Sequence, residues 1–150
     1  MLRPVIGPAR PEDRQAVEDL LSLCGLPLDG VGDHYERFLV AMEGGVAGAP
    51  VILGCAGLEV YGSVCIFRSL AVRPGERGAG LGRAIFEAAL DGARRTGCTD
   101  VYLLTYTIER MAGLMGFTRI ARDEVPLEAR TSSEFTINAC ASAAVMHREL

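Results

Sequence analysis

Lysine is absent from the sequence. The 15 basic residues are all arginines, and against 19 acidic residues they leave a formal net charge of −4. A protein that binds nucleic acid needs a basic run to neutralise a series of phosphates, and this sequence contains none. The composition therefore argues against nucleic acid as a partner.

Long apolar runs are absent as well. No stretch approaches the roughly 18 residues that a membrane-spanning helix needs, and Met1–Pro4 does not lead into the apolar core of a signal peptide. With 49% hydrophobic and 23% charged residues, the composition is that of a globular chain. We therefore expect a cytoplasmic protein, and a length of 150 residues predicts a single domain, 1–150, with one core.

The five cysteines lack the spacing of a metal site or of a disulfide framework. Their number is odd, they are widely spread, the sequence has no Cys-x-x-Cys, and only His34 and His147 could assist them. We therefore expect no bound metal. Most of the cysteines are expected to be small buried apolar residues.

The spacing of apolar residues, and the glycines that interrupt it, predict one mixed α/β sheet layer with helices on both faces. The expected strands are 5–6, 38–42, 51–61, 63–72, 101–106, 117–121 and 143–148, and the expected helices are 11–24, 81–96, 108–115 and 127–130, with one further turn at 34–37. The segment 44–50 favours a hairpin connection because it holds Gly44, Gly45, Gly48 and Pro50. A polar link is expected between 130 and 143.

Strand 63–72 is expected at the centre of the sheet. Its apolar residues occupy both parities, one of which comprises Val64, Ile66, Leu70 and Val72. Both faces of the strand should therefore be buried. A helix separates this strand from 101–106, which predicts that the two strands are parallel. That helix carries on one side Leu81, Ile85, Ala88, Ala89 and Gly92.

A glycine-rich loop, Arg77-Gly78-Ala79-Gly80-Leu81-Gly82, connects the central strand to this helix. Glycines let the backbone turn and approach a ligand, and the first amides of a helix point outward at the positive end of its dipole. Such a loop suits a phosphate. Two common phosphate motifs are excluded: a P-loop ends in Gly-Lys-Ser/Thr, and a dinucleotide fingerprint beginning at Gly78 needs a glycine where Arg83 stands.

The Arg-x-x-Gly-x-Gly pattern after a strand that ends in Leu70-Ala71-Val72 resembles the acetyl-CoA loop of the GCN5-related N-acetyltransferases (GNAT), and Gly116-Phe117 fits the same family. The resemblance implies a mostly antiparallel sheet, flanked by helices, in which a parallel strand pair splays apart to admit CoA. It also implies that loop amides hold the CoA diphosphate, that the strand end positions the pantetheine arm, and that the Val72 N–H donates to the acetyl oxygen. The cofactor-binding residues implied are Leu70, Ala71, Val72, Arg77, Gly78, Ala79, Gly80, Leu81, Gly82, Arg83 and Thr105.

Two charged residues interrupt apolar strands. Glu59 lies in strand 51–61, where a carboxylate must be paired, hydrated or functional. We expect it to bind or deprotonate the substrate amine; the alternative is a carboxylate that faces solvent or pairs with a neighbouring arginine. Arg68 lies inside the central strand, where a guanidinium needs an anion or water. We expect Arg68, with Ser69 beside it, to bind a substrate carboxylate; the alternative is an internal salt bridge, for which Glu59 is one candidate partner.

At the position whose residue often protonates the leaving thiolate in this family, the sequence differs from the family pattern. The family often uses a tyrosine here, but this chain has Ala112 at that position. Tyr106 is a candidate replacement, with simple packing as its alternative, and the CoA thiol can also leave unaided. Thr105 stands where the family often has an asparagine that contacts the cofactor.

The C-terminal part resembles a narrower group, the arsenic-resistance N-acetyltransferases and the amino-acid acetyltransferases similar to N-acetylglutamate synthase. The residues that carry this resemblance are Arg122-Asp-Glu-Val-Pro126, Thr131, Glu134-Phe135, Cys140 and Ser142-Ala143. It implies an amino acid, or an analogue such as an organoarsenical, as acceptor.

We therefore predict an acetyl-CoA-dependent N-acetyltransferase that acts on a small carboxylate-bearing amine by direct attack in a ternary complex, with a homodimer as the expected assembly. Two alternatives stay open. One is acetylation of a protein or peptide N-terminus, and the other is a non-catalytic acyl-CoA-binding sensor, which agrees with Ala112.

Overall fold

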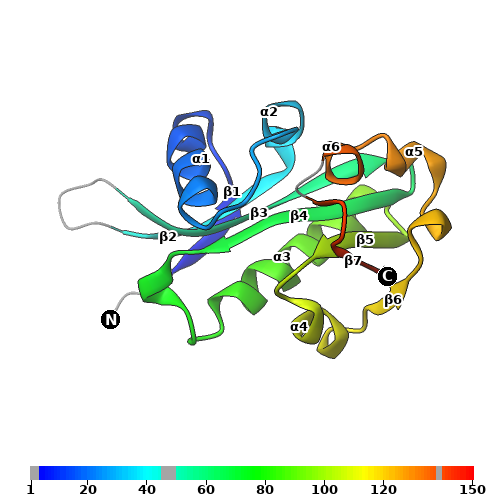
Figure 1. Cartoon of the computed structure of the whole chain (residues 1–150). Coiled ribbons are helices and arrows are strands. Elements are labelled where there is room, and N and C mark those ends of the chain that lie inside the picture. Colours follow the sequence, from blue (N-terminus) through cyan, green and yellow to red (C-terminus); the bar gives the residue numbers. More distant parts are fainter. Residues whose placement is uncertain (1–3, 45–49, 138–139) are drawn as a thin grey trace. The chain divides into compact units, whose positions relative to one another are not determined.

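The structure is a computed structural model that describes residues 4–44, 50–137 and 140–150. Within these ranges seven strands are hydrogen-bonded in the order β1-β2-β3-β4-β5-β7-β6, and helices flank them (Figure 1). β4 (Val64–Val72) and β5 (Asp100–Thr105) run parallel. The pairs β1–β2, β2–β3, β5–β7 and β6–β7 are antiparallel. The predicted mixed, mostly antiparallel sheet with one parallel pair is therefore confirmed.

The chain forms two compact units. The first consists of Met1–Gly57 and Ser69–Ala89, and the second of Leu58–Arg68 and Leu90–Leu150. The division falls within β3 (Val51–Tyr61), β4 and α3 (Leu81–Thr96), so each of these elements contributes residues to both units. The single domain expected from chain length stays a prediction.

In the first unit, α1 (Arg14–Leu23) follows a 3-10 turn at Pro11–Asp13 and buries one side against the strands. α2 (Val31–His34) and a second 3-10 turn, Tyr35–Arg37, come next and confirm the helical turn expected there. β1 (Val5–Pro8) pairs with β2 (Phe38–Glu43). The core of this unit comprises Val17, Leu20, Leu21, Val31, Phe38, Val40, Ile52, Cys55 and Ala71.

β2 and β3 pair from Phe38↔Gly57 to Glu43↔Val51, with a register shift at Ala41/Met42. The connection predicted between them includes residues 45–49, which lie outside the described residues. At the other end of the pair, the ring of Phe38 covers Gly57 so closely that a Cβ there would lie 2.4 Å from Phe38 Cε1. Phe38 is fully buried, so its ring has little room to move.

Replacing Gly57 by Ala should therefore destabilise the protein by about 1–3 kcal/mol, the usual cost of overpacking a core. Gly92→Ala in α3 is the matched control, because the nearest atom to a new Cβ there, Arg95 Nη2, is 3.8 Å away. We expect the control to be neutral or stabilising by up to about 1 kcal/mol, since alanine favours helix over glycine. Urea unfolding of both variants measures the difference, and equal midpoints would contradict the packing described.

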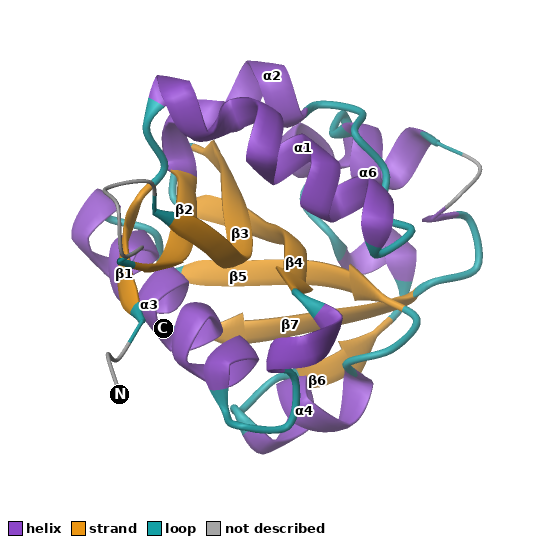
Figure 2. Ribbon diagram, turned by 90° about the vertical axis from the view of Figure 1, so that its left-hand side faces the viewer, coloured by secondary structure: helices purple, strands orange, loops and turns teal. Residues whose placement is uncertain are grey.

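In the second unit, β5 pairs with β7 (Ala144–Glu149) from Asp100↔Glu149 to Thr105↔Ala144, and β6 (Thr118–Ile120) pairs with the other edge of β7 (Figure 2). The remaining helices of this unit are α4 (Glu109–Leu114), α5 (Leu127–Arg130) and α6 (Ser133–Thr136). Its core comprises Val64, Ile66, Tyr102, Val125, Ala129 and Val145. The parallel register of β4 and β5 runs from Val64↔Asp100 to Ile66↔Tyr102.

Two sequence-based predictions need correction. The segment after Arg130 was expected to be a polar link, but it contains α6, a single helical turn capped by the Ser132 hydroxyl, which accepts from the Glu134 amide. The buried side of α3 consists of Ile85, Phe86, Ala89, Leu90 and Ala93, whereas Ala88 and Gly92 are only half-buried. The larger side chains decide which side turns inward, because they remove more apolar surface from water.

The alternation predicted along β4 does not run through Ser69. This residue has a φ of 59°, a left-handed conformation that is uncommon outside glycine and typical of a bulge in a strand. Beyond it, Ala71 packs into the core with α1, while Val72 Cγ2 would lie 3.5 Å from a Cβ at Gly82 at the start of α3. The shared parity expected for Val64, Ile66, Leu70 and Val72 therefore fails at Ser69.

The five cysteines, all among the described residues, form no disulfide with one another; four of them are buried, as expected for most of them, and Cys24 is half-buried. Among the described residues, no helix combines the length and the apolar character needed to cross a membrane.

Candidate active site

The loop between β4 and α3 is exposed from Arg73 to Gly80. Gly78 and Gly80 have φ values of 88° and 85°, which side chains rarely tolerate. The first hydrogen bond of α3 runs from the Ala84 amide to the Gly80 carbonyl at 3.1 Å. The amides of residues 81–83 therefore belong to the first helical turn, where no intrahelical acceptor exists. Amides in such a position are suited to an anion, and the binding of a phosphate by this loop stays a prediction.

Arginine side chains fasten the loop to the strands of the first unit. Arg77 donates from Nε to the Val72 carbonyl at 3.1 Å, and its Nη2 lies 3.4 Å from Cys24 Sγ. Arg73 donates from Nε and Nη2 to the Ile52 carbonyl at 3.2 and 3.1 Å. Arg83 instead pairs with Glu87 on the exposed side of α3 at 3.2 Å. Arg73 and Arg77 thus cover strand-end carbonyls with positive charge.

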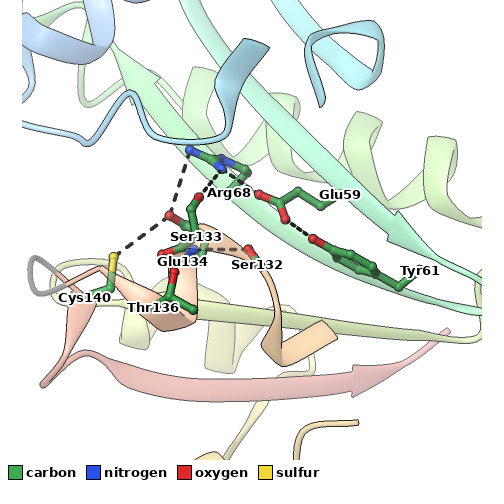
Figure 3. Close-up of polar contacts among 8 residues, drawn as sticks. All are labelled: Glu59, Tyr61, Arg68, Ser132, Ser133, Glu134, Thr136 and Cys140. Atoms are coloured by element: carbon green, nitrogen blue, oxygen red, sulfur yellow. Dashed lines mark hydrogen bonds and ion pairs between the residues drawn. The ribbon is translucent and has the colours of Figure 1, made fainter. Parts of the chain in front are cut away.

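A buried ion pair forms the centre of the second unit (Figure 3). Arg68 Nη1 on β4 lies 2.6 Å from Glu59 Oε2 on β3, and both side chains are 0% exposed. The other oxygen, Glu59 Oε1, accepts a 2.5 Å hydrogen bond from the Tyr61 hydroxyl. The structure thus brings together the two charged strand residues singled out in the sequence, in the arrangement that was the stated alternative for each.

The surroundings of Glu59 keep it ionised. Burial by itself raises its carboxyl pKa, but the hydrogen bonds from Tyr61, Ser132 and Arg68 outweigh burial, so the pKa lies below its usual value of 4.5. Burial and the hydrogen bond to Glu59 raise the pKa of Tyr61 to about 12. At neutral pH the cluster therefore contains a carboxylate and a neutral phenol.

The C-terminal tail supplies a second carboxylate. Arg68 Nη2 lies 3.9 Å from Glu134 Oε2, and Arg68 Nη1 donates to Ser133 Oγ at 3.4 Å (Figure 3). Cys140 Sγ lies 3.9 Å from the same Glu134 oxygen. In the sequence, Glu134 and Cys140 stand out only as parts of a family pattern, and Ser132 and Ser133 are not predicted as site residues. The available signal was Ser132 two residues before an acid, a common helix start.

The remaining predicted site residues lie near the end of β5. Thr105 is buried, and its Oγ1 accepts from the amides of Thr107 and Ile108 at 3.0 and 2.9 Å, which starts α4. Tyr106 is 59% exposed, and its hydroxyl lies 3.2 Å from Ser142 Oγ. Ala112 is fully buried in α4. Among the described residues, no group of His, Cys, Asp or Glu side chains could hold a metal ion.

A family model described as the acetyltransferase (GNAT) family matches residues 6–117. The chain belongs to this family. It is accordingly an acetyl-CoA-dependent N-acetyltransferase, as the glycine-rich loop after β4 predicted.

Known relatives point in the same direction. An amino-acid acetyltransferase of Mycobacterium tuberculosis is 31% identical over 133 residues, which make up 84% of this chain and 75% of the relative. A structure of Rv2747 from Mycobacterium tuberculosis in complex with CoA and NLQ shares 25% identity and a TM-score of 0.80, covering 98% of this chain and 99% of that one.

N-acetylglutamate synthase from Neisseria gonorrhoeae, complexed with CoA and N-acetyl-glutamate, has the same fold, with a TM-score of 0.82 at 22% identity. The match covers 98% of this GNAT chain but only 35% of the synthase chain. The comparison with the synthase therefore concerns one part of a longer protein.

Replacing Glu59 by Gln should cost about 3–5 kcal/mol at pH 7, because Arg68 would lose its closest buried partner. A carboxyl whose pKa is lowered in the folded state stabilises the protein above its unfolded pKa, here 4.5, and this stability is lost as the pH falls through the folded pKa. The stability gap between wild type and variant should therefore shrink below that pH.

Urea unfolding at pH 7 and at successively lower pH measures this gap. Glu128→Gln, which removes an exposed carboxylate on α5, is the control and should change stability little at either pH. A gap that is absent at neutral pH, or that does not shrink in acid, would contradict the role assigned to the pair.

Proposed function

We propose that this enzyme transfers an acetyl group from acetyl-CoA to the amino group of a small amino-acid-like substrate that bears a carboxylate. The observation that carries the proposal is the guanidinium of Arg68 buried within β4, a position where arginine is stable only when it meets anions. An amino-acid acetyltransferase among the relatives supports the same substrate class. Amino-acid analogues, organoarsenical ones included, belong to this class.

The residues present fit acetyl-CoA. Gly78 and Gly80 leave open space where a Cβ would stand, so a diphosphate could approach the backbone there. We assign the diphosphate to residues Arg77–Arg83, the pantetheine arm to Leu70, Ala71 and Val72, and a weaker cofactor contact to Thr105. The cofactor supplies the acetyl group as a thioester, and the Val72 N–H would donate to its carbonyl oxygen.

The acid–base roles follow from the charge states. Glu59 is ionised at neutral pH, and a carboxylate with a lowered pKa is a weak base, so we assign it to attracting and orienting the substrate amine rather than to taking its proton. Ser69, which follows Arg68 and has a left-handed backbone conformation, is assigned to the substrate. Tyr106 is assigned as proton donor to the thiolate because its hydroxyl is exposed and is already oriented by Ser142.

A turnover assay tests the proposal directly. Release of CoA thiol from acetyl-CoA is followed with a panel of amino acids, their α-amides and short peptides. We expect release with an amino acid and much less with its amide. Release with peptides alone would favour N-terminal acetylation instead. Binding of CoA without release for any amine would favour the sensor, the alternative that Ala112 raises.

Replacing Arg68 by Lys keeps a cation beside Glu59 but removes the planar fork that suits a carboxylate. We expect KM for the amino acid to rise about tenfold to a hundredfold, the worth of one charge-assisted hydrogen bond, with KM for acetyl-CoA unchanged. Arg119→Lys, at an exposed arginine of β6, is the control. An unchanged KM for the amino acid in Arg68→Lys would remove the carboxylate role.

Replacing Gly80 by Ala places a side chain at a φ of 85° and so strains the loop conformation. We expect the free variant loop to relax away from this conformation, so that regaining it on binding costs about 1–2 kcal/mol, which corresponds to roughly fivefold to thirtyfold weaker CoA binding. Gly75→Ala in the same loop is the matched control, since its φ is ordinary and no atom lies within 4 Å of the new Cβ. Calorimetric titration with CoA distinguishes them, and equal affinities in both variants would contradict the diphosphate assignment.

A further inference from the structure

The guanidinium of Arg68 faces two carboxylates at once. Nη1 meets Glu59 Oε2 at 2.6 Å, and Nη2 faces Glu134 Oε2 at 3.9 Å (Figure 3). A substrate carboxylate at Arg68 would be a third anion beside one cation. Like charges repel strongly where water is excluded, so three carboxylates cannot share this guanidinium without one of them leaving or becoming protonated.

The two carboxylates are held very differently. Glu59 lies on β3, its side chain is 0% exposed, and it accepts a hydrogen bond from Tyr61 in addition to its close ion pair. Glu134 lies on the four-residue helix α6, its side chain is 8% exposed, and its contact with Arg68 is 1.3 Å longer (3.9 against 2.6 Å). A single helical turn has little stability of its own. Glu134 is therefore the carboxylate that can move at the lower cost.

We propose that Glu134 is an exchangeable partner of Arg68, whose carboxylate occupies Nη2 until the carboxylate of the acceptor substrate replaces it. This inference rests on the function proposed above. Glu134 thereby determines specificity, because an acceptor with a carboxylate can replace it at Arg68 and an acceptor without a carboxylate cannot. It also lowers the apparent affinity for the correct substrate, which binds only to the fraction of molecules in which Arg68 is released.

The local backbone allows this exchange. The Ser132 hydroxyl accepts from the Glu134 amide at 3.1 Å, and the Phe135 and Ile137 amides donate to the Ser132 and Ser133 carbonyls at 3.0 Å each. These bonds define the turn without using the Glu134 carboxylate. Rotation of the side chain away from Arg68 therefore leaves these three hydrogen bonds intact, and it gives up the 3.9 Å contact between Cys140 Sγ and Glu134 Oε2.

Glu134→Gln tests the exchange because it keeps the size of the side chain and removes the competing charge. We expect KM for the amino acid that wild type acetylates best to fall about threefold to tenfold, the scale of one partly buried charge pair. KM for the α-amide of the same amino acid should not change. Glu128→Gln, which removes an exposed negative charge from neighbouring α5, should change neither value.

Glu134→Ala is a second variant that removes the carboxylate together with any hydrogen bond a glutamine could make. A lower KM for the amino acid alone, in either variant, supports the exchange. A KM that is unchanged or raised in both variants, or that falls equally for the amide, overturns it, because the side chain then acts by packing or by blocking entry. If wild type does not prefer the amino acid over its amide, the proposed function fails, and the exchange fails with it.

Discussion

The second unit depends on the ion pair between Arg68 and Glu59, which is closed to water. Removing two charges from water costs several kcal/mol per ion, and the attraction between them offsets this cost only when the remaining polar atoms are also satisfied. Here the Tyr61 hydroxyl donates to the second oxygen of the Glu59 carboxylate, while Ser133 and Glu134 contact the Arg68 guanidinium. Packed hydrophobic residues of the same volume would hold β3 to β4 at least as firmly. A costly pair at this position therefore agrees with the substrate-binding role proposed for it.

In the first unit, the backbone conformation of the loop between β4 and α3 is the main constraint. The positive φ values of Gly78 and Gly80 and the hydrogen bond from the Ala84 amide to the Gly80 carbonyl set the direction of the first α3 amides. Arg73 and Arg77 secure the loop by donating to carbonyls at strand ends. Two arginines of the loop therefore already have hydrogen-bond partners within the protein. The anion-binding role proposed for the loop thus rests on main-chain geometry, which is why glycines rather than particular side chains mark it in the sequence.

Most of the fold could be predicted from the sequence, because long strands and long amphipathic helices repeat their signal over many residues. β3, α1 and the parallel β4–β5 pair are examples. The left-handed conformation of Ser69 could not be predicted, since a serine in this conformation leaves no mark in an apolar pattern. The buried side of α3 was misplaced because its small residues were given the same weight as Phe86 and Leu90.

The candidate site could be predicted only in part, for a similar reason. An arginine in an apolar strand signals that an anion must lie nearby, but the identity of that anion depends on which distant segments fold against it. Glu59 was recognised as one candidate, whereas Glu134 lies 66 positions after Arg68 on a helix of one turn. Local patterns carry no information about such a contact. The polar character of the tail was therefore interpreted as a link.

The substrate-binding proposal requires that Arg68 binds the carboxylate of the acceptor. A crystal structure of the protein with CoA and its best amino-acid acceptor would show whether it does. We expect the acceptor carboxylate within hydrogen-bond distance of Arg68 Nη2, with the Glu134 carboxylate turned away and Glu59 still paired. An acceptor carboxylate bound by other residues, with Glu134 still facing Arg68, would contradict it.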